Sequence, residues 1–416
     1  MDYFVDTIDR YLQAISGCDH FLVKKVSEKN YGVINYLVSN SDTFPTVTNK
    51  DTEENLTNIL RRNCRGIKFR LSDGKILALP HWKFFNIGEK EETQENCIIL
   101  GDTFHFIEKL DGSMVHPILI NDKILWMTKM GENNTSEHIT KFINQHPNKE
   151  NIEKLARNLL TSNYTPCFEF CSPTAKIIVQ YNDPSLYLTE IRNNFTGKIV
   201  PIDQLISVSN EYDIPMGKIH QLKFNTIHDL VEEVRIWENS EGIIIRTTSD
   251  KFKLKTDWYR ERHRVVSDLM TEKSALTAII VNDNLDDLLS YLDDGDFKTK
   301  VTKYGKDVTE EILKIINHAS ELILEAKKND VSSINFYEYL KTNGIFYHII
   351  MMKLYRRTFT ENLQEADIKE ILLEQYRSFM VRKISNSVRL EEHRDWIGGL
   401  RYSDYTLNLF FNIDFE

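Results

Sequence analysis

The sequence contains no hydrophobic run long enough to cross a membrane. A membrane-spanning helix needs about 20 consecutive apolar residues, and no segment of the 416 residues approaches that length. The first residues, MDYFVDTIDRYLQ, are acidic and amphipathic, unlike the basic start of a signal peptide. We therefore expect an intracellular protein without membrane contact, located in the cytoplasm, or in the host cytoplasm if the chain is viral.

Paired cysteines are also missing. The five cysteines are an odd number and are scattered along the chain without a CxxC pair. This pattern argues against a disulfide framework and against a zinc site. Cys167 and Cys171 lie close together in CFEFC, but no second pair of ligands accompanies them.

Positive charge is scarce, since 52 basic residues face 62 acidic ones and the net charge is −10. That balance argues against a protein whose whole surface coats nucleic acid, and it leaves room for a local basic cleft. The hydrophobic fraction of 41% and the charged fraction of 27% are ordinary for globular proteins. Because 416 residues exceed one ordinary core, we expect a folded protein of two domains.

Strand-like and helix-like segments occupy different parts of the chain. Up to about residue 260, short runs rich in β-branched and aromatic residues recur, among them YGVINYLV, KILALP, AKIIVQY and SEGIIIRT. After DWYRERHRVVSDLM the pattern changes to long amphipathic segments such as DVTEEILKIINHASELILEAKKN. The predicted fold class is α+β, with antiparallel sheets in an N-terminal domain over residues 1–260 and an all-α domain over residues 261–416.

The segment HFIEKLDGSMVHPILI interrupts a strand pattern with a cation, an acid and a glycine. Asp-Gly is a strong hairpin signal, so a surface turn is the plain alternative. An ordered series of further motifs favours a site instead. The series is CRGIKF with Arg65, HWKFFNIGE with Lys83 and Phe85, KLDGS with Lys109, Asp111 and Gly112, WMTKMG with Lys129, CFEF with Glu169, SEGIIIR with Glu241, and KFKLKTDWY with Lys253, Lys255 and Tyr259.

This series resembles the nucleotidyltransferase motifs of the covalent ligase and capping-enzyme superfamily, and is most similar to those of the phage RNA ligase 1 family. The resemblance extends from Tyr36 to Tyr259. It implies an ATP-dependent RNA ligase that joins a 3′-OH end to a 5′-phosphate end through a lysyl-adenylate and an RNA-adenylate. The implied substrate is nicked tRNA, and the helical domain would confer the preference for tRNA.

The resemblance also implies a role for each motif residue. Lys109 would be the nucleophile, Glu169 would contact the ribose, and Glu241 would bind Mg²⁺, with Mn²⁺ as the alternative. Asp111 would be a second metal ligand, or would orient the lysine or a metal-bound water. The phosphates would be bound by Arg65, Lys83, Lys253 and Lys255, and further nucleotide contacts would come from Tyr36, Phe85, Gly112, Lys129 and Tyr259.

Attack by Lys109 on ATP requires a neutral amine. Lowering a lysine pKa from about 10.4 to near 7.5 corresponds to about 4 kcal/mol. A single positive charge about 5 Å away supplies roughly 3 kcal/mol, and a divalent cation about twice that. A bound metal is therefore a sufficient cause, with Lys253 and Lys255 assisting.

Several alternatives stay open. A DNA ligase or capping enzyme would continue into an OB barrel, where this chain has helical patterns. A non-catalytic, ligase-like RNA-binding module would not need Lys109, and the aromatic residues could be plain core. No phosphate-loop signature GxxxxGK[ST] follows the motifs, so end-healing by a kinase and phosphatase would require a separate protein.

Some neighbouring residues are predicted to lie outside the site. Lys251 opens the lysine run of KFKLK but falls outside the KxK pair, so we expect a solvated flank. His105, His116 and His263 have no spacing that suggests a triad or a metal site. We expect them to be hydrogen-bonded or exposed histidines.

Overall fold

The computed structural model describes residues 4–5, 7–37, 39, 42–48, 50–100, 103–173, 178–248, 250–269, 271–282, 285–290, 292, 295–343, 348–361, 363–386 and 397–406. The chain divides into two compact units, Met1–Arg260 and Glu261–Phe411. None of the helices in these described ranges has the length and apolar character of a membrane span.

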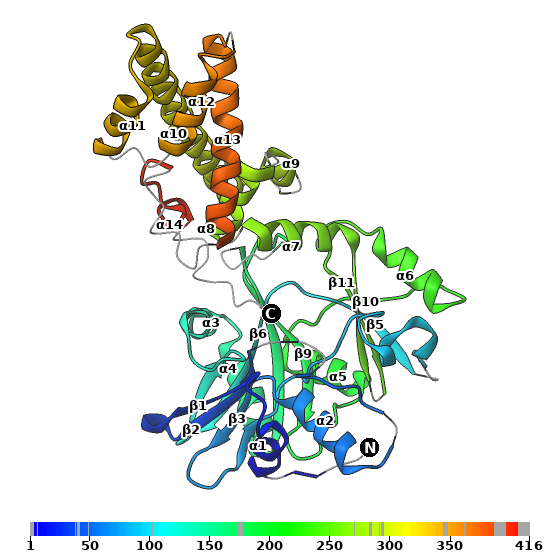
Figure 1. The fold of residues 1–416 in the computed structure, drawn as a ribbon. Helices are drawn as coiled ribbons and strands as arrows, with labels where there is room; N and C mark the ends of the chain where they lie inside the picture. Colours follow the sequence, from blue (N-terminus) through cyan, green and yellow to red (C-terminus); the bar gives the residue numbers. More distant parts are fainter. Residues whose placement is uncertain are drawn as a thin grey trace. The chain divides into compact units, whose positions relative to one another are not determined.

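Antiparallel sheets form the first unit (Figure 1). Within the described residues there are three, each of four strands. One pairs β1 (Phe21–Val26), β2 (Tyr31–Tyr36), β3 (Ile67–Arg70) and β4 (Ile76–Ala78) in chain order. The second has the order β10 (Ile219–His220), β5 (Phe104–Glu108), β11 (Gly242–Thr247) and β12 (Lys251–Lys255). The third has the order β7 (Lys123–Met127), β6 (Ser113–Ile120), β8 (Tyr164–Cys171) and β9 (Ser185–Asn193).

Amphipathic helices bury their apolar faces against these sheets. They are α1 (Asp9–Ile15), α2 (Glu53–Asn63), α3 (Asn134–Gln145), α4 (Lys149–Thr161), α5 (Ile202–Tyr212) and α6 (Ile227–Arg235), with short 3₁₀ turns at Ser27–Lys29, Glu91–Thr93 and Glu95–Cys97. In α4, Ile152, Leu155 and Ala156 recur at helical spacing and join a core with Phe168 of β8. Helix α6 packs on β11 and β12 through Leu230.

Two local features place the strands that matter for the site. The register of β5 on β11 brings the residue after β5 to the start of β11, where Lys109 N donates to Gly242 O at 2.9 Å. Between β8 and β9 the pairing shifts from Cys167 opposite Glu190 to Phe168 opposite Leu188. Thr189 is therefore the extra residue of a β-bulge, a feature that re-aims side chains.

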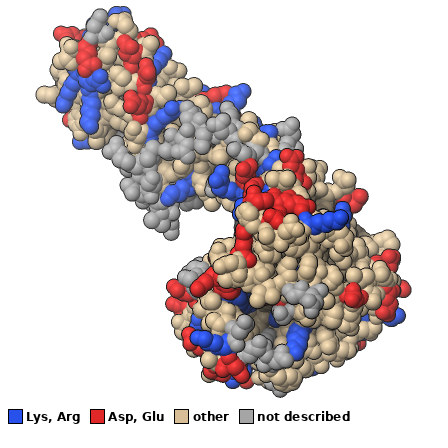
Figure 2. All heavy atoms as spheres, turned by 90° about the vertical axis from the view of Figure 1, so that its right-hand side faces the viewer, with Lys and Arg blue, Asp and Glu red and all other residues tan. Residues whose placement is uncertain are grey.

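The second unit is helical. Helix α7 (Asp257–Leu269) crosses the boundary, and α8 (Glu272–Leu276), a π-helical turn (Thr277–Asn282), α9 (Leu285–Ser290), α10 (Asp296–Lys328), α11 (Ser333–Thr342), α12 (His348–Arg357), α13 (Glu365–Asn386) and α14 (Tyr402–Thr406) follow. Tyr304, Val308 and Ile312 of α10 lie four residues apart and are buried in the core of this unit. The predicted α+β class, with sheets first and helices after, is confirmed. On the face drawn in Figure 2, acidic and basic side chains are interspersed over this unit.

Candidate nucleotidyltransferase site

A buried carboxylate connects two of the predicted lysines. Lys109 Nζ lies 2.7 Å from Glu241 Oε2, and Lys255 Nζ lies 2.9 Å from Glu241 Oε1. The Glu241 side chain is 2% exposed and the Lys109 side chain 10%. The structure thus joins the KLDGS, EG and KLK motifs through direct contacts, which a surface turn at Lys109 would not produce.

The glycine of the EG motif is required by the backbone. Gly242 has a φ of 127°, and a Cβ at this position would lie 2.0 Å from Leu254 O. Only glycine fits both conditions. Its absent side chain lets β11 and β12 approach closely at the point where Glu241 enters the site.

Asp111 is held by three hydrogen bonds. Tyr259 OH donates to its Oδ1 at 2.8 Å, and the backbone N–H groups of Ile178 and Val179 donate to its Oδ2 at 2.7 Å each. Burial, followed by the nearby negative charge of Glu241, raises the pKa of Asp111 to about 6 despite these donors. The contacts suit an orienting group, and metal binding by Asp111 stays a prediction.

Gly112 and Tyr259 complete this part of the site in different ways. A Cβ on Gly112 would lie 2.4 Å from Phe170 O, so glycine permits the start of β6 to pack against β8. Tyr259, at the start of α7, is 3% exposed, and its ring lies 4.8 Å from Lys255 Nζ. Tyr259 therefore links Lys255 to Asp111.

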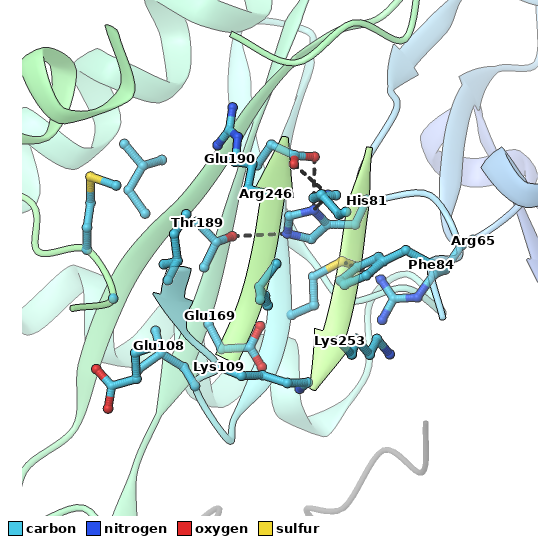
Figure 3. Close-up of a pocket in the computed structure, with 18 residues that line it drawn as sticks. Arg65, His81, Phe84, Glu108, Lys109, Glu169, Thr189, Glu190, Arg246 and Lys253 are labelled. Atoms are coloured by element: carbon cyan, nitrogen blue, oxygen red, sulfur yellow. Dashed lines mark hydrogen bonds and ion pairs between the residues drawn. The ribbon is translucent and has the colours of Figure 1, made fainter. Parts of the chain in front are cut away.

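A cavity of about 70 Å³ lies beside Lys109. Four predicted site residues line it: Arg65, Lys109, Glu169 and Lys253. Lys109 and Glu169 lie at one end, and His81, Glu190 and Arg246 lie at the other (Figure 3). A paired amine, a carboxylate and two further cations thus converge on one pocket, as phosphoryl transfer from a nucleotide requires.

Comparison with known proteins identifies relatives of this chain. A family model described as RNA ligase matches residues 63–259. A putative RNA ligase of Thermovibrio ammonificans is 28% identical over 324 residues, covering 76% of this chain and 80% of that protein. RNA ligase 1 of bacteriophage TS2126 is 24% identical over 242 residues, covering 56% of this chain and 58% of that protein. These matches support an RNA ligase that is related to the phage-type enzymes. Among solved structures, an archaeal ATP-dependent RNA ligase is similar with a TM-score of 0.41 at 12% identity, covering 73% of this chain and 78% of that one.

The prediction for Lys251 of this ligase is wrong. Lys251 is buried, with Nζ 2.5 Å from Glu190 Oε2 and 3.0 Å from His81 Nδ1, and it packs 4.0 Å from the centre of the Trp82 ring. Burial, partly offset by Glu190, lowers the pKa of Lys251 to about 8. The cluster of His81, Glu190 and Lys251 was missed because its members are far apart in sequence and match no spacing motif.

The prediction for His116 is wrong as well. His116 on β6 is fully buried, and among the described residues neither ring nitrogen has a hydrogen-bond partner. Burial first, and the nearby basic side chain of Lys68 second, keep its pKa well below the usual value. His105 is half-buried, and His263 Nδ1 lies 3.4 Å from Ser267 Oγ.

A buried lysine of the CRGIKF motif, which was not among the predicted site residues, organises the Arg65 segment. Lys68 Nζ donates to Gly66 O at 2.7 Å, Thr128 O at 3.0 Å and Lys129 O at 3.3 Å, and burial keeps its pKa well below the ordinary value. Gly66, with a φ of 88°, packs directly on Lys129, whose Cα would lie 2.8 Å from a Cβ there. Arg65 and Lys129 are thereby brought side by side, and both are largely buried.

Tyr36, Lys83 and Phe85 form a second group. Lys83 Nζ lies 5.2 Å from the centre of the Tyr36 ring and 5.7 Å from that of Phe85, within cation–π range. Lys253 N donates to Phe85 O at 2.9 Å, which ties this group to β12. Tyr36 and Phe85 are buried with Phe44, so they serve as core packing, and their contact with a nucleotide stays a prediction.

The donor set is compatible with a magnesium ion. Among the described residues there is no cluster of three or more His, Cys, Asp or Glu that would form an all-protein metal site. Mg²⁺ usually binds one or two carboxylates together with substrate phosphates and water. Glu241 pairs with Lys109, and Glu169 lines the pocket beside Lys109, so these carboxylates fit that arrangement.

Proposed function

We propose that this RNA ligase is ATP-dependent and joins 3′-OH and 5′-phosphate RNA ends through an adenylate on Lys109. The observation that supports the proposal best is the Lys109 amine, which lies 2.7 Å from the buried Glu241 carboxylate in a pocket shared with Arg65 and Lys253. A module that only binds RNA has no need for a buried amine held in this way.

Three transfers at phosphorus make up the proposed reaction. Lys109 Nζ gives up a proton and forms a bond to the α-phosphorus of ATP as the bond to pyrophosphate breaks. The adenylyl group then passes to the RNA 5′-phosphate, which restores the lysine. The 3′-OH finally attacks that phosphate, so that a phosphodiester forms and AMP leaves.

The ion pair between Lys109 and Glu241 must open before attack, because the charged amine has no lone pair to donate. Mg²⁺, or Mn²⁺ in its place, would supply positive charge that favours the neutral amine and the departing pyrophosphate. Lys255, whose Nζ forms an ion pair with Glu241 Oε1, would keep the carboxylate in position. Asp111 would orient Lys109 or a metal-bound water.

The other site residues would bind the nucleotide. Glu169 would contact the ribose, and cations on three segments would stabilise the phosphates. These cations are Arg65, Lys83, Lys253 and Lys255. The guanidinium of Arg65 suits bidentate phosphate binding, which a lysine would not reproduce. Tyr36, Phe85, Gly112, Lys129 and Tyr259 would complete the pocket.

The two units would have different functions in the reaction. Residues 1–260 would be the adenylyltransferase domain, since every motif residue lies there. Residues 261–416 would confer specificity for nicked tRNA, with end-healing by a separate kinase and phosphatase. The separate helical core of the second unit supports a distinct role for it.

The test is transfer of label from α-labelled ATP to protein in the presence of Mg²⁺, after pyrophosphate treatment removes bound AMP. The native chain should retain acid-labile, base-stable label, and Lys109→Ala should retain none. Lys154→Ala is the matched control, because Lys154 is an exposed lysine of the same unit on α4. An unlabelled native chain that still binds RNA would overturn the proposal in favour of the RNA-binding module.

A further inference from the structure

The first unit contains a second, larger cavity. Its volume is about 680 Å³, within the range of roughly 300–1,000 Å³ that is typical of ligand sites. Helix α2, the segment before α5 and the turn that connects β11 to β12 contribute to its lining. No residue predicted from the nucleotidyltransferase motifs lines this cavity.

Two arginine donors on the cavity lining lack acceptors. Arg246 is 3% exposed; its Nη2 donates to Val200 O, and its Nη1 has no hydrogen-bond partner in the described part of the chain. Arg62 donates through Nη2 to Pro45 O at 3.1 Å and pairs with Glu92, while its Nε has no partner there. A buried guanidinium N–H without an acceptor is costly. Both side chains line the cavity, so their positive charge would favour an anion bound there.

The charge of the lining indicates an anion. Four lining side chains are cationic and two are acidic, an excess of two positive charges. They are Arg62, Arg192, Lys198 and Arg246 against Asp203 and Asp250. Arg192 is fixed by bonds to Gly197 O at 2.7 Å, Pro80 O at 2.6 Å and Asn63 Oδ1 at 2.6 Å, so its charge is part of a rigid wall. Arginine clusters of this kind recognise phosphate oxygens.

The cavity adjoins the nucleotide pocket without overlapping its reactive end. Arg246 borders both, and its guanidinium points away from Lys109 (Figure 3). Lys109 pairs with Gly242 at the start of β11, and Arg246 is four residues further along the strand. At about 3.3 Å per residue this is roughly 13 Å.

We infer that this cavity binds a phosphodiester of the RNA strand, at a nucleotide set back from the end that is being joined. The inference rests on the proposed function, because it takes RNA as the substrate. Arg246 and Arg62 would donate to the phosphate oxygens, and the exposed Lys198 would attract the strand at the rim. The volume of the cavity exceeds that of a lone phosphate and leaves space for the attached sugar or base.

Equilibrium binding of a single-stranded RNA to the full chain tests the inference, with Lys198→Gln as the main variant. For single strands, each lost phosphate contact makes the slope of log K against log salt shallower by about 0.7. We expect that change for Lys198→Gln, together with an affinity several-fold weaker at low salt. Lys154→Gln removes an exposed lysine away from the cavity and should behave like the native chain. Arg246→Gln, checked for folding by thermal melting, should weaken binding further.

Native affinity and salt slope in both Lys198→Gln and Arg246→Gln would overturn the inference. A Lys198→Gln variant that loses affinity for inorganic phosphate or ATP, but not for RNA, would assign the cavity to a small anion and would also overturn it. Labelling by ATP is measured on the same preparations and normalises them for active enzyme. If the native chain is labelled by ATP and both variants bind RNA as the native chain does, only this inference is overturned. If the native chain is not labelled, the proposed function is overturned.

Discussion

His81 is buried beside Lys251, and these two effects outweigh the neighbouring Glu190 carboxylate and keep the imidazole neutral. Its Nδ1 is 2.9 Å from Glu190 Oε1 and 3.0 Å from Lys251 Nζ, and its Nε2 is 3.0 Å from Thr189 Oγ1. Burial first, and the charge of Lys251 second, lower the pKa of His81 to about 4. Between about pH 6.5 and 4 the unfolded chain therefore binds more protons than the folded one, so stability falls as the pH falls.

We expect this histidine to contribute up to about 3 kcal/mol of acid destabilisation across that window. His81→Gln cannot titrate, so its free energy of unfolding should fall less between pH 7 and pH 5 than that of the native chain. Urea denaturation at the two pH values measures the difference. Because His116 shifts in the same direction, the native loss should shrink without vanishing. Equal losses in both proteins would contradict the assignment to His81.

Sequence patterns could identify the motif residues but not the groups that hold them. Lys109 and Glu241 were predicted from the order of short motifs, and the structure places them 2.7 Å apart. Lys251 was misplaced because its partners, Glu190 and His81, come from distant segments that no spacing rule connects. Lys68, whose three acceptors are backbone carbonyls, likewise leaves no signature in side-chain motifs.

At the level of secondary structure, strand β12 presents three lysines on one face, because alternate residues of a strand point the same way. Two of them are anchored by buried carboxylates, Lys251 by Glu190 and Lys255 by Glu241. Lys253 lies between them, with Nζ 4.9 Å from the centre of the Phe84 ring. The pairs at both ends fix the strand that presents Lys253 to the pocket.

Removing one partner of the buried Glu190–Lys251 ion pair should lower the free energy of unfolding more than replacing both partners by apolar residues. Glu190→Gln leaves the Lys251 ammonium buried without a counter-charge, and we expect a loss of about 3–5 kcal/mol in the free energy of unfolding. The double variant Glu190→Leu with Lys251→Met removes both charges and should recover much of that loss. Chemical denaturation of the two variants makes the comparison. A double variant that is less stable than the single one would show that the pair is a net source of stability.

Strand pairing was less predictable than the strands themselves. Alternation in SEGIIIRT and KFKLK indicated β11 and β12, which pair as neighbours. The pairing of β11 with β5 joins segments more than 100 residues apart and depends on packing that a local pattern does not contain. The bulge at Thr189, which turns this side chain toward His81, is equally invisible in local alternation.

At the level of the whole molecule, the chain is two units with separate cores. Phe168 in the first unit is fully buried, and its ring lies 5.6 Å from that of Trp126. Tyr355 in the helical unit is also fully buried, and it donates to Val331 O at 2.5 Å and Ala326 O at 3.2 Å. The change of sequence pattern near residue 260 reflects this division, because each unit has its own hydrophobic periodicity.

Because compact units with their own cores unfold as cooperative blocks, we expect two transitions in calorimetry. Tyr355→Ala should lower the transition temperature of the helical unit, and Phe168→Ala should lower that of the first unit. Each substitution should reduce the free energy of unfolding of its own unit by about 3–5 kcal/mol. ATP with Mg²⁺ should raise only the transition that Phe168→Ala lowers, since every proposed nucleotide contact lies in the first unit. A single transition that both substitutions lower equally would mean that the units fold as one. A nucleotide effect on the Tyr355-sensitive transition would instead place part of the ATP site in the helical unit.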